Sequence, residues 1–501
     1  MSERSGAGAE RSDGLAALGW FALAAALRFL ALGRFSLWGD EVYSLDNSLD
    51  LFGPRMVAAD LAFPVFFALE RLVLELAGLA GPAPDPQALQ FVLRLLPALA
   101  GSIAAAAAFR SSRGFLGRRE RHVLAALVAF SPWFLYFSQL ARFYSLVLAF
   151  CIPATFELMR AQREGSFRRA LAGVTWIALA IGTHPTAGLL LLGELAAVGG
   201  AALLRVRPLS RAVVPLVALP LLMAVPALLW PSTVSDTIGY KLRAQDAAVE
   251  SFGGLLLGIG WNVGPVIGAL GVLGLPTLWR RDRELALHVV LGAGVPTALM
   301  LALAALHKSV EQRYLIAVVP LALLPAAAFI GELSDRLERT VRGAAVAVPA
   351  LALAAWAPGI VSELIDGNRH DLAGALRFVT ERLRPGDGVI VETHGLARRY
   401  LPDSLADEQL LEAPPPSGDA EWRKYESMWG GCPRLWIVIP ADFEEKTAET
   451  RSFHRWAWEQ GRLAQELWRP RLDYHQNRLR VFVVEPERAM KWHPRWQPRG
   501  G

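Results

Sequence analysis

The chain reads Arg34-Phe35-Ser36-Leu37-Trp38-Gly39-Asp40-Glu41 directly after an apolar run from Leu15 to Gly33. The apolar run is close to the roughly 20 residues that a helix needs to cross a bilayer. Asp40 and Glu41 are therefore predicted to lie at the boundary between membrane and water. Two adjacent carboxylates at that depth suit proton transfer or cation binding beside a lipid-borne substrate.

The composition of the whole chain is that of a membrane protein. Of 501 residues, 53% are hydrophobic and only 19% are charged, whereas soluble domains carry about 25% charged residues. The net charge is +5, but the arginines lie between apolar runs, which indicates membrane topology and not a nucleic-acid partner. Cys151 and Cys432 are too far apart in sequence to suggest a disulfide framework or a zinc site.

The apolar runs predict eleven membrane-spanning helices. The first run is too long for the core of a signal peptide, so we expect it to be retained. The candidate spans are approximately 14–33, 88–109, 122–138, 143–159, 170–186, 187–204, 212–230, 252–278, 285–306, 314–331 and 343–361.

The charged connections predict the orientation, because Lys and Arg are enriched in short cytoplasmic loops. If the N-terminus is cytoplasmic, five connections on the cytoplasmic side are rich in arginine, while the short connections on the other side carry few basic residues. The arginines are Arg110, Arg113, Arg118, Arg119, Arg121, Arg160, Arg163, Arg168, Arg169, Arg205, Arg207, Arg211, Arg280, Arg281, Arg283, Arg336, Arg339 and Arg342.

This alternation holds only if residues 61–80 do not span the membrane. Their apolar start is followed by Glu70, Arg71 and Glu75, and charges at a bilayer centre cost several kcal/mol each. A helix on the membrane surface would place the charges in water; the alternative is a twelfth span with a salt-bridged face. The surface helix gives a first exterior loop over 34–87, with Asp60 at the start of its second helix.

Three further polar clusters are predicted on the same side as Asp40 and Glu41. They are Ser138 to Tyr144, Thr183-His184-Pro185, and His307 to Tyr314. This convergence indicates a functional site on the exterior side.

From Ser362 the composition becomes charged and mixed. Short strands are predicted at 388–392, 435–439 and 479–484, and amphipathic helices at 369–384 and 442–463. Residues 362–501 are therefore predicted to form an extracytoplasmic α/β domain. The domain has neither a GxGxxG nor a GxxxxGK[ST] phosphate loop.

Three motifs in order resemble those of the GT-C glycosyltransferases. They are Trp38-x-Asp40-Glu41, Ser138-Gln-x-Ala-Arg142-x-Tyr144-Ser145, and Arg313-Tyr314 at the opening of a late span. More narrowly, over roughly 14–331, the chain resembles the protein O-mannosyltransferase and aminoarabinose-transferase-like branch. The resemblance implies inverting transfer from a polyprenyl-phosphate sugar outside the cytoplasmic membrane, with Asp40 as the catalytic carboxylate. It also implies that the first exterior loop folds into two surface helices.

The chain departs from that branch at two places. Relatives often carry Asp-x-His-Pro-Pro in the first loop, where this chain has Asp60-Leu61-Ala62-Phe63-Pro64, and Ser-Gln-Glu-Ala-Arg, where it has Leu140. A second acidic role is therefore in doubt. A changed acceptor, a metal-free mechanism and lost activity remain open.

The carboxylates have both chemical and structural interpretations. Asp40 is predicted to be the general base that accepts the proton of the acceptor hydroxyl, although an Asp there also suits a helix N-cap. Glu41 would hold the acceptor or help bind a cation, or would support the helix dipole. Asp60 is a secondary acidic candidate, with a plain N-cap as its alternative.

The cationic and aromatic residues are predicted to bind the donor. Guanidinium groups match phosphate oxygens, so the phosphate of the lipid donor is expected to contact Arg313, Tyr314, Lys308, Arg142, Tyr144 and His184. The structural alternatives are arginines that extend toward lipid headgroups and a histidine that ends a helix.

The sequence thus predicts a polytopic glycosyltransferase of the cytoplasmic (inner) membrane, with its N-terminus in the cytoplasm and a catalytic part over 1–361. Its expected partners are a polyprenyl-phosphate sugar, a lipid, glycan or protein acceptor, and membrane lipids, but no nucleic acid. The sequence specifies no cofactor, and a divalent cation remains open. The alternatives are a transporter or flippase for a lipid-linked glycan, and a catalytically silent relative that acts as an assembly partner.

Overall fold

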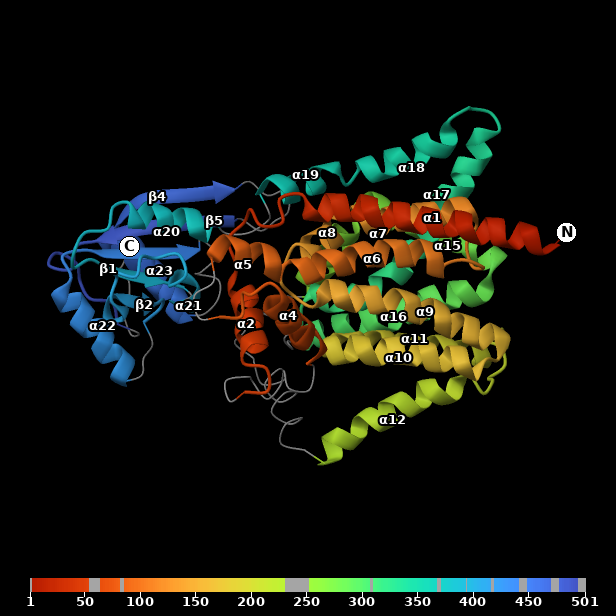
Figure 1. The fold of residues 1–501 in the computed structure, drawn as a ribbon, viewed down its shortest axis with the longest axis horizontal. Coiled ribbons are helices and arrows are strands. Elements are labelled where there is room, and N and C mark those ends of the chain that lie inside the picture. The colour runs from red at the N-terminus through yellow and green to blue at the C-terminus, as the bar shows by residue number, and fades with distance from the viewer. Residues whose placement is uncertain are drawn as a thin grey trace.

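In the computed structural model, long helices run side by side, with the N-terminus at one end and a β-sheet beyond the other (Figure 1). The structure describes residues 2–53, 64–81, 85–229, 252–306, 310–366, 371–392, 394–415, 419–440, 448–469 and 477–493.

The helical part is built from apolar helices of different lengths. They are α1 (Ser2–Phe29), α6 (Leu95–Ser111), α7 (Arg118–Phe130), α8 (Pro132–Ser138), α9 (Tyr144–Glu164), α10 (Phe167–Thr183), α11 (Gly188–Leu203), α12 (Val213–Leu229), α14 (Phe252–Val263), α15 (Pro265–Arg281), α16 (Arg283–Ala305), α17 (Val319–Glu338), α18 (Ala344–Ala354) and α19 (Ala357–Asp366). The 3-10 turns η1 (Pro185–Ala187) and η2 (Gln312–Ala317) precede α11 and α17.

Four of the described helices are long and apolar enough to cross a membrane by length and composition, or up to six if each of two bent pairs is one span. The architecture is that of a polytopic helical membrane protein. The number of eleven spans remains a prediction.

Three of the predicted spans are broken, which corrects their description as single helices. Helices α14 and α15 meet at 86° and α18 and α19 at 56°. The first break is at Gly264, whose φ of 84° favours glycine, and Pro265 then starts the next helix. The predicted span at 122–138 is divided at Ser131, between α7 and α8. The Ser131 side chain accepts the Phe134 N–H and caps α8.

A pair of glycines lets α11 and α16 approach closely. A Cβ at Gly193 would lie 2.1 Å from the Gly292 carbonyl oxygen. Small residues at such contacts let transmembrane helices pack backbone against backbone. The contact fixes the separation of two candidate membrane spans.

The first exterior loop contains α2 (Gly39–Leu49) and α4 (Val65–Leu76), and α5 (Pro86–Leu93) then begins the candidate span Gln87–Ser111. Helices α2 and α4 lie across the ends of the long helices (Figure 1). With 12 residues, α4 is shorter than the roughly 20 residues needed to cross a bilayer. The described part of the loop thus contains two short helices, while Asp60, Ala62 and Phe63 lie outside the described residues.

The prediction that all the charges of α4 face water is wrong for Glu70. Arg71 and Glu75 are partly exposed and pair at 2.6 Å, but Glu70 is only 1% exposed. Glu70 is spaced four residues from both Phe66 and Leu74, so it lies on the buried face of the helix.

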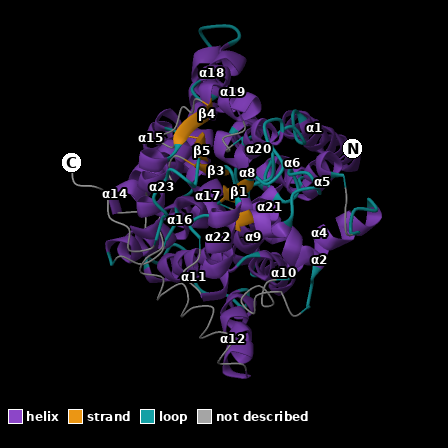
Figure 2. Cartoon of the chain, turned by 90° about the vertical axis from the view of Figure 1, so that its left-hand side faces the viewer, coloured by secondary structure: helices purple, strands orange, loops and turns teal. Residues whose placement is uncertain are grey.

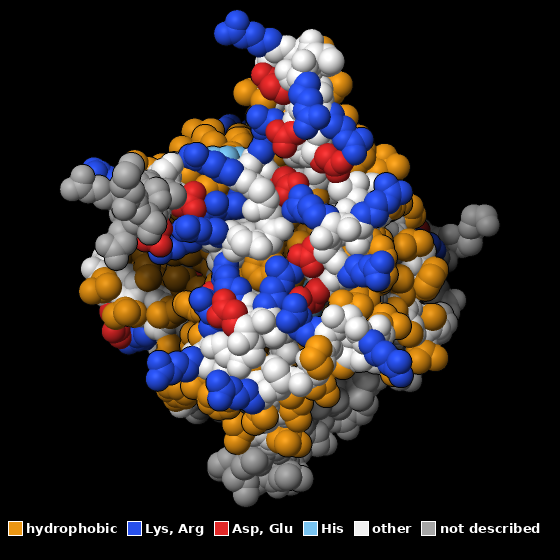
Figure 3. All heavy atoms as spheres, turned by 90° about the vertical axis from the view of Figure 1, so that its right-hand side faces the viewer, with side chains coloured by type: hydrophobic (Ala, Val, Ile, Leu, Met, Phe, Trp, Pro, Cys, Tyr) orange, Lys and Arg blue, Asp and Glu red, His pale blue; other side chains and the backbone are white. Residues whose placement is uncertain are grey.

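The five arginine-rich connections meet at the end of the bundle that carries the N-terminus, where side chains of both signs intermingle (Figure 3). Ion pairs link the connections: Arg163 pairs with Asp282, Arg207 with Glu284 at 2.9 Å, Arg281 with Glu120 at 2.5 Å, and Arg119 with Asp335. The predicted alternation of charge thus places these connections at one end and the acidic pair at the other.

The C-terminal part is a five-stranded sheet with helices, seen end-on in Figure 2. The strand order is β2-β1-β3-β5-β4, with β1 parallel to β2 and β3, and β5 antiparallel to β3 and β4. Buried apolar clusters cover both faces of the sheet. The elements are α20 (Leu372–Thr380), β1 (Gly388–Val391), α21 (His394–Ala397), η3 (Asp407–Gln409), β2 (Leu410–Glu412), α22 (Asp419–Gly431), β3 (Leu435–Pro440), α23 (Ala448–Gln460), β4 (Arg462–Arg469) and β5 (Asn477–Val484).

Candidate active site

Asp40 lies in the first turn of α2 at the end of the bundle that faces the sheet. Trp38 is the N-cap residue of this helix, so Asp40 is not the cap. Its side chain is 34% exposed, although Glu41 beside it is fully buried. Successive helical residues point about 100° apart, which gives the two carboxylates different environments.

Glu41 forms a buried ion pair with Arg94, between α5 and α6. Its two oxygens accept Arg94 Nε and Nη2, each at 2.7 Å. They also accept the Trp38 N–H at 3.0 Å and the Ala141 N–H at 2.8 Å. These contacts tie the start of α2 to the segment that carries Arg142, a structural role that the sequence analysis did not include.

Two arginines from distant parts of the chain surround Asp40. Its Oδ2 lies 3.2 Å from Arg313 Nη1 and 4.0 Å from Arg142 Nη2. Arg142 Nη1 also donates to the Asp40 carbonyl and to Ser44 Oγ, both at 3.0 Å. The structure thus brings together one carboxylate and two guanidinium groups that the sequence had placed on one side.

An aromatic wall completes the cluster. His184 caps η1 and stacks on Phe143 with ring centroids 3.9 Å apart, and it lies 5.8 Å from Tyr144 and 6.3 Å from Tyr314. The Arg313 guanidinium is 5.9 Å from the Tyr144 ring centroid. The six described residues predicted for the Asp40 base and the donor contacts therefore converge: Asp40, Arg142, Tyr144, His184, Arg313 and Tyr314. Lys308 and Asp60 lie outside the described residues.

Glu311 is a member of the cluster that the sequence analysis did not single out. It pairs with Arg313 Nε and accepts the Tyr314 hydroxyl at 3.2 Å. Its position two residues before Arg313 in the sequence could have identified it as a partner of that arginine. Arg94 was also missed, although an arginine inside a predicted span is a signal for a buried partner.

The described residues do not fit a cation at this site. Asp40 and Glu311 both face the Arg313 guanidinium, so a fixed positive charge already lies between the two carboxylates. Within the described ranges, no group of three or more His, Cys, Asp or Glu side chains is arranged as metal ligands.

The C-terminal part touches the loop that leads into Asp40. The Tyr400 hydroxyl accepts the Leu37 N–H at 3.0 Å and is 2.8 Å from the Gln90 side-chain amide. Arg399 lies 3.7 Å from Asp46 on α2. The sheet-bearing part therefore contributes to the position of the acidic helix.

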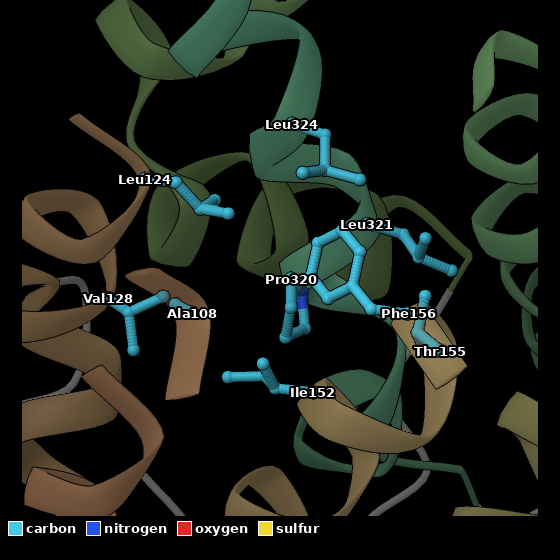
Figure 4. Close-up of a pocket in the computed structure, with 9 residues that line it drawn as sticks. All are labelled: Ala108, Leu124, Val128, Ile152, Thr155, Phe156, Pro320, Leu321 and Leu324. Carbon is cyan, nitrogen blue, oxygen red and sulfur yellow. The ribbon is translucent and has the colours of Figure 1, made fainter. Parts of the chain in front are cut away.

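Two of the cavities among the described residues lie away from this cluster. One of about 10 Å³, shown in Figure 4, is lined by apolar side chains such as Ile152 and Leu321 and holds at most a single water. The other, of about 730 Å³, opens at the basic end, where Arg160 and Arg169 pair with Glu157. Neither contains the Asp40 cluster.

The fold is similar to that of ArnT from Cupriavidus metallidurans in the apo state, at 15% identity and a TM-score of 0.55, over 95% of this chain and 100% of that one. ArnT bound to undecaprenyl phosphate gives 15% identity and 0.49, over 95% and 99%. The oligosaccharyltransferase AglB from Archaeoglobus fulgidus, in complex with an inhibitory peptide and a dolichol-phosphate, gives 12% and 0.49, over 85% and 70%. No protein-family model and no curated protein matches the sequence. The similarity to apo ArnT confirms the fold that the predicted resemblance implied, and it shows the fold alone.

Proposed function

We propose that this chain is a glycosyltransferase that moves a sugar from a polyprenyl-phosphate carrier to an acceptor on the extracytoplasmic side of the membrane. The observation that carries the proposal is the cluster of an accessible Asp40 carboxylate and two guanidinium groups at one end of the bundle. The arginine-rich connections meet at the opposite end, which supports a cytoplasmic N-terminus and an extracytoplasmic C-terminal α/β domain.

Asp40 acts as the general base in this proposal. It takes the proton from the acceptor hydroxyl while the acceptor oxygen bonds to the anomeric carbon from the face opposite the phosphate. The bond between the anomeric carbon and the phosphate oxygen breaks, and its electron pair leaves with the polyprenyl phosphate. Attack from the opposite face inverts the anomeric configuration.

Arg313 and Arg142 hold the phosphate of the donor. In the structure Arg313 is shared between Asp40 and Glu311, and a phosphate would compete for its N–H groups. Donor binding would then release Asp40 from Arg313 and stabilise the charge that develops on the leaving group. Glu41 serves this site through its contacts with Arg94 and Ala141, and Tyr144, Tyr314 and His184 line the donor side.

The test is transfer by purified protein in proteoliposomes, supplied with a panel of radiolabelled polyprenyl-phosphate sugars and an envelope extract as the acceptor source. We expect Asp40→Asn to bind donor and to transfer at least about 100-fold more slowly, the size of a general-base contribution. Glu75→Gln, on the exposed side of α4, is the matched control and should retain activity. Near-normal transfer by Asp40→Asn would place the base elsewhere.

One observation favours the alternative of a transporter for a lipid-linked glycan. Glu194 of α11 and His288 of α16 are buried inside the bundle with their side chains 3.6 Å apart, and ionisable groups between spanning helices often mark transport pathways. Movement of donor across the bilayer without release of polyprenyl phosphate would support transport. Release of polyprenyl phosphate coupled to sugar transfer would support the enzyme and would also exclude a silent assembly partner.

A further inference from the structure

A buried carboxyl group lies under the helix that carries Asp40. Glu70 of α4 is 1% exposed, and its Oε2 is 2.6 Å from Ser48 Oγ on α2. Its Oε1 is buried and has no hydrogen-bond partner among the residues that the structure describes. The mechanism above does not use this group.

The hydrogen bonds around Ser48 indicate which form of Glu70 fits the site. Ser48 Oγ is also 2.8 Å from the Ser44 carbonyl oxygen, and a hydroxyl has one proton to donate. A neutral Glu70 donates to Ser48, and Ser48 donates to Ser44, so both protons are used. An ionised Glu70 would be left with one neutral donor and a bare oxygen, which is a poor environment for a buried charge.

These contacts continue to the proposed catalytic carboxylate. Asp40, Ser44 and Ser48 are spaced four residues apart and share one face of α2. Ser44 Oγ donates to the Asp40 carbonyl at 3.1 Å and accepts from Arg142 Nη1 at 3.0 Å. Glu70 therefore lies at the inner end of a polar row that ends at Asp40 and Arg142.

We propose that Glu70 is a positioning residue that keeps its proton while the site works and thereby leaves Arg142 to Asp40 and to the donor phosphate. The proposal rests on the proposed function, because it assigns Arg142 to the donor. Loss of the proton would create a second carboxylate that competes for the Arg142 guanidinium, and transfer would slow.

The surroundings of Glu70 favour retention of the proton. Burial is the largest effect and raises the pKa of Glu70 to about 8. Ser48 and Arg142 oppose this rise, and Glu41 adds to it. Of the other helices packed on α4, α5 carries no ionisable residue, and the arginines of α6 and α10 lie at their far ends.

The first test is the pH profile of transfer with the wild-type protein and Glu70→Gln, which keeps the shape and a donor for Ser48 but cannot ionise. Wild-type kcat/KM should fall about tenfold between pH 7 and 9, as expected for one group that loses a proton near pH 8. In Glu70→Gln this fall should disappear, and in Glu75→Gln it should persist. An unchanged alkaline fall in Glu70→Gln overturns the proposal.

The second test does not depend on activity, so it separates this proposal from the proposed function. Between about pH 4.5 and about pH 8, the folded protein keeps a proton that the unfolded chain has already lost. Its stability should therefore fall through that window and level off above it, and Glu70→Gln should flatten the fall in the melting temperature. If no donor is turned over but Glu70→Gln flattens the fall in melting temperature, the proposed function is wrong, while Glu70 is still protonated in the folded protein. If the wild type and Glu70→Gln show the same pH dependence of melting, Glu70 is already ionised and the proposal fails.

Discussion

The Glu41–Arg94 ion pair leads to a sharp prediction, because both side chains are fully buried. Glu41→Gln removes the charge and turns an amide N–H₂ toward N–H donors. The remaining amide oxygen can still accept from one Arg94 nitrogen, while the other Arg94 N–H and one backbone N–H, of Trp38 or Ala141, lose their acceptor. Breaking a buried pair in this way costs about 3–5 kcal/mol. Losing two charge-assisted bonds, at about 1.5–3 kcal/mol each, gives a similar value.

The assay is thermal unfolding of purified protein in one detergent at one scan rate. Glu41→Gln should lower the melting temperature by several degrees, whereas Glu75→Gln, which breaks the exposed pair with Arg71, should change stability by less than about 1 kcal/mol. A double variant, Glu41→Gln with Arg94→Gln, should cost less than the sum of the two single changes, because no unpaired charge is left. If Glu41→Gln and Glu75→Gln have the same melting temperature, the assignment of Glu41 to a structural role is refuted.

Two further predictions concern packing and the contact between the two parts of the chain. Gly193→Ala should destabilise the protein by about 1–3 kcal/mol, because its Cβ meets the Gly292 carbonyl at 2.1 Å; Gly199→Ala, with open space around its Cβ, should be neutral or stabilising in the same melting assay. Tyr400→Phe leaves the Leu37 N–H without its acceptor and should cost about 1–3 kcal/mol. It should also slow sugar transfer by displacing the loop before Asp40, and unchanged melting and transfer would contradict this.

The sequence predicted which polar side chains gather at one end of the bundle, because the alternation of charge fixes which loops share a side. Asp40, Arg142, His184 and Arg313 are separated by long stretches of chain, yet each follows or precedes an apolar run at the same end. The three strands near 388, 435 and 479 were also predicted correctly, because short apolar runs between charged segments are typical of buried strands.

Other features depended on the direction of individual side chains, which hydropathy does not resolve. Asp40 and Glu41 are neighbours with the same chemistry, and only the rotation of the helix puts one at the surface and the other against Arg94. Glu70 has charged neighbours in sequence but shares a face with Phe66 and Leu74. The right-angled break at Gly264 was missed because both halves are apolar and read as one span.

That break has a consequence for how the molecule sits in its bilayer. If α15 crosses the membrane, α14 lies nearly flat along the surface, and its Asn262 donates to Gln312 Oε1 at 2.6 Å, one residue before Arg313. In that arrangement, the depth of Arg313 in the membrane is tied to a helix that lies among the lipid headgroups. Bilayer thickness becomes a tuning variable: thinner or thicker lipids would shift the height of the guanidinium relative to a carrier phosphate anchored in the same leaflet.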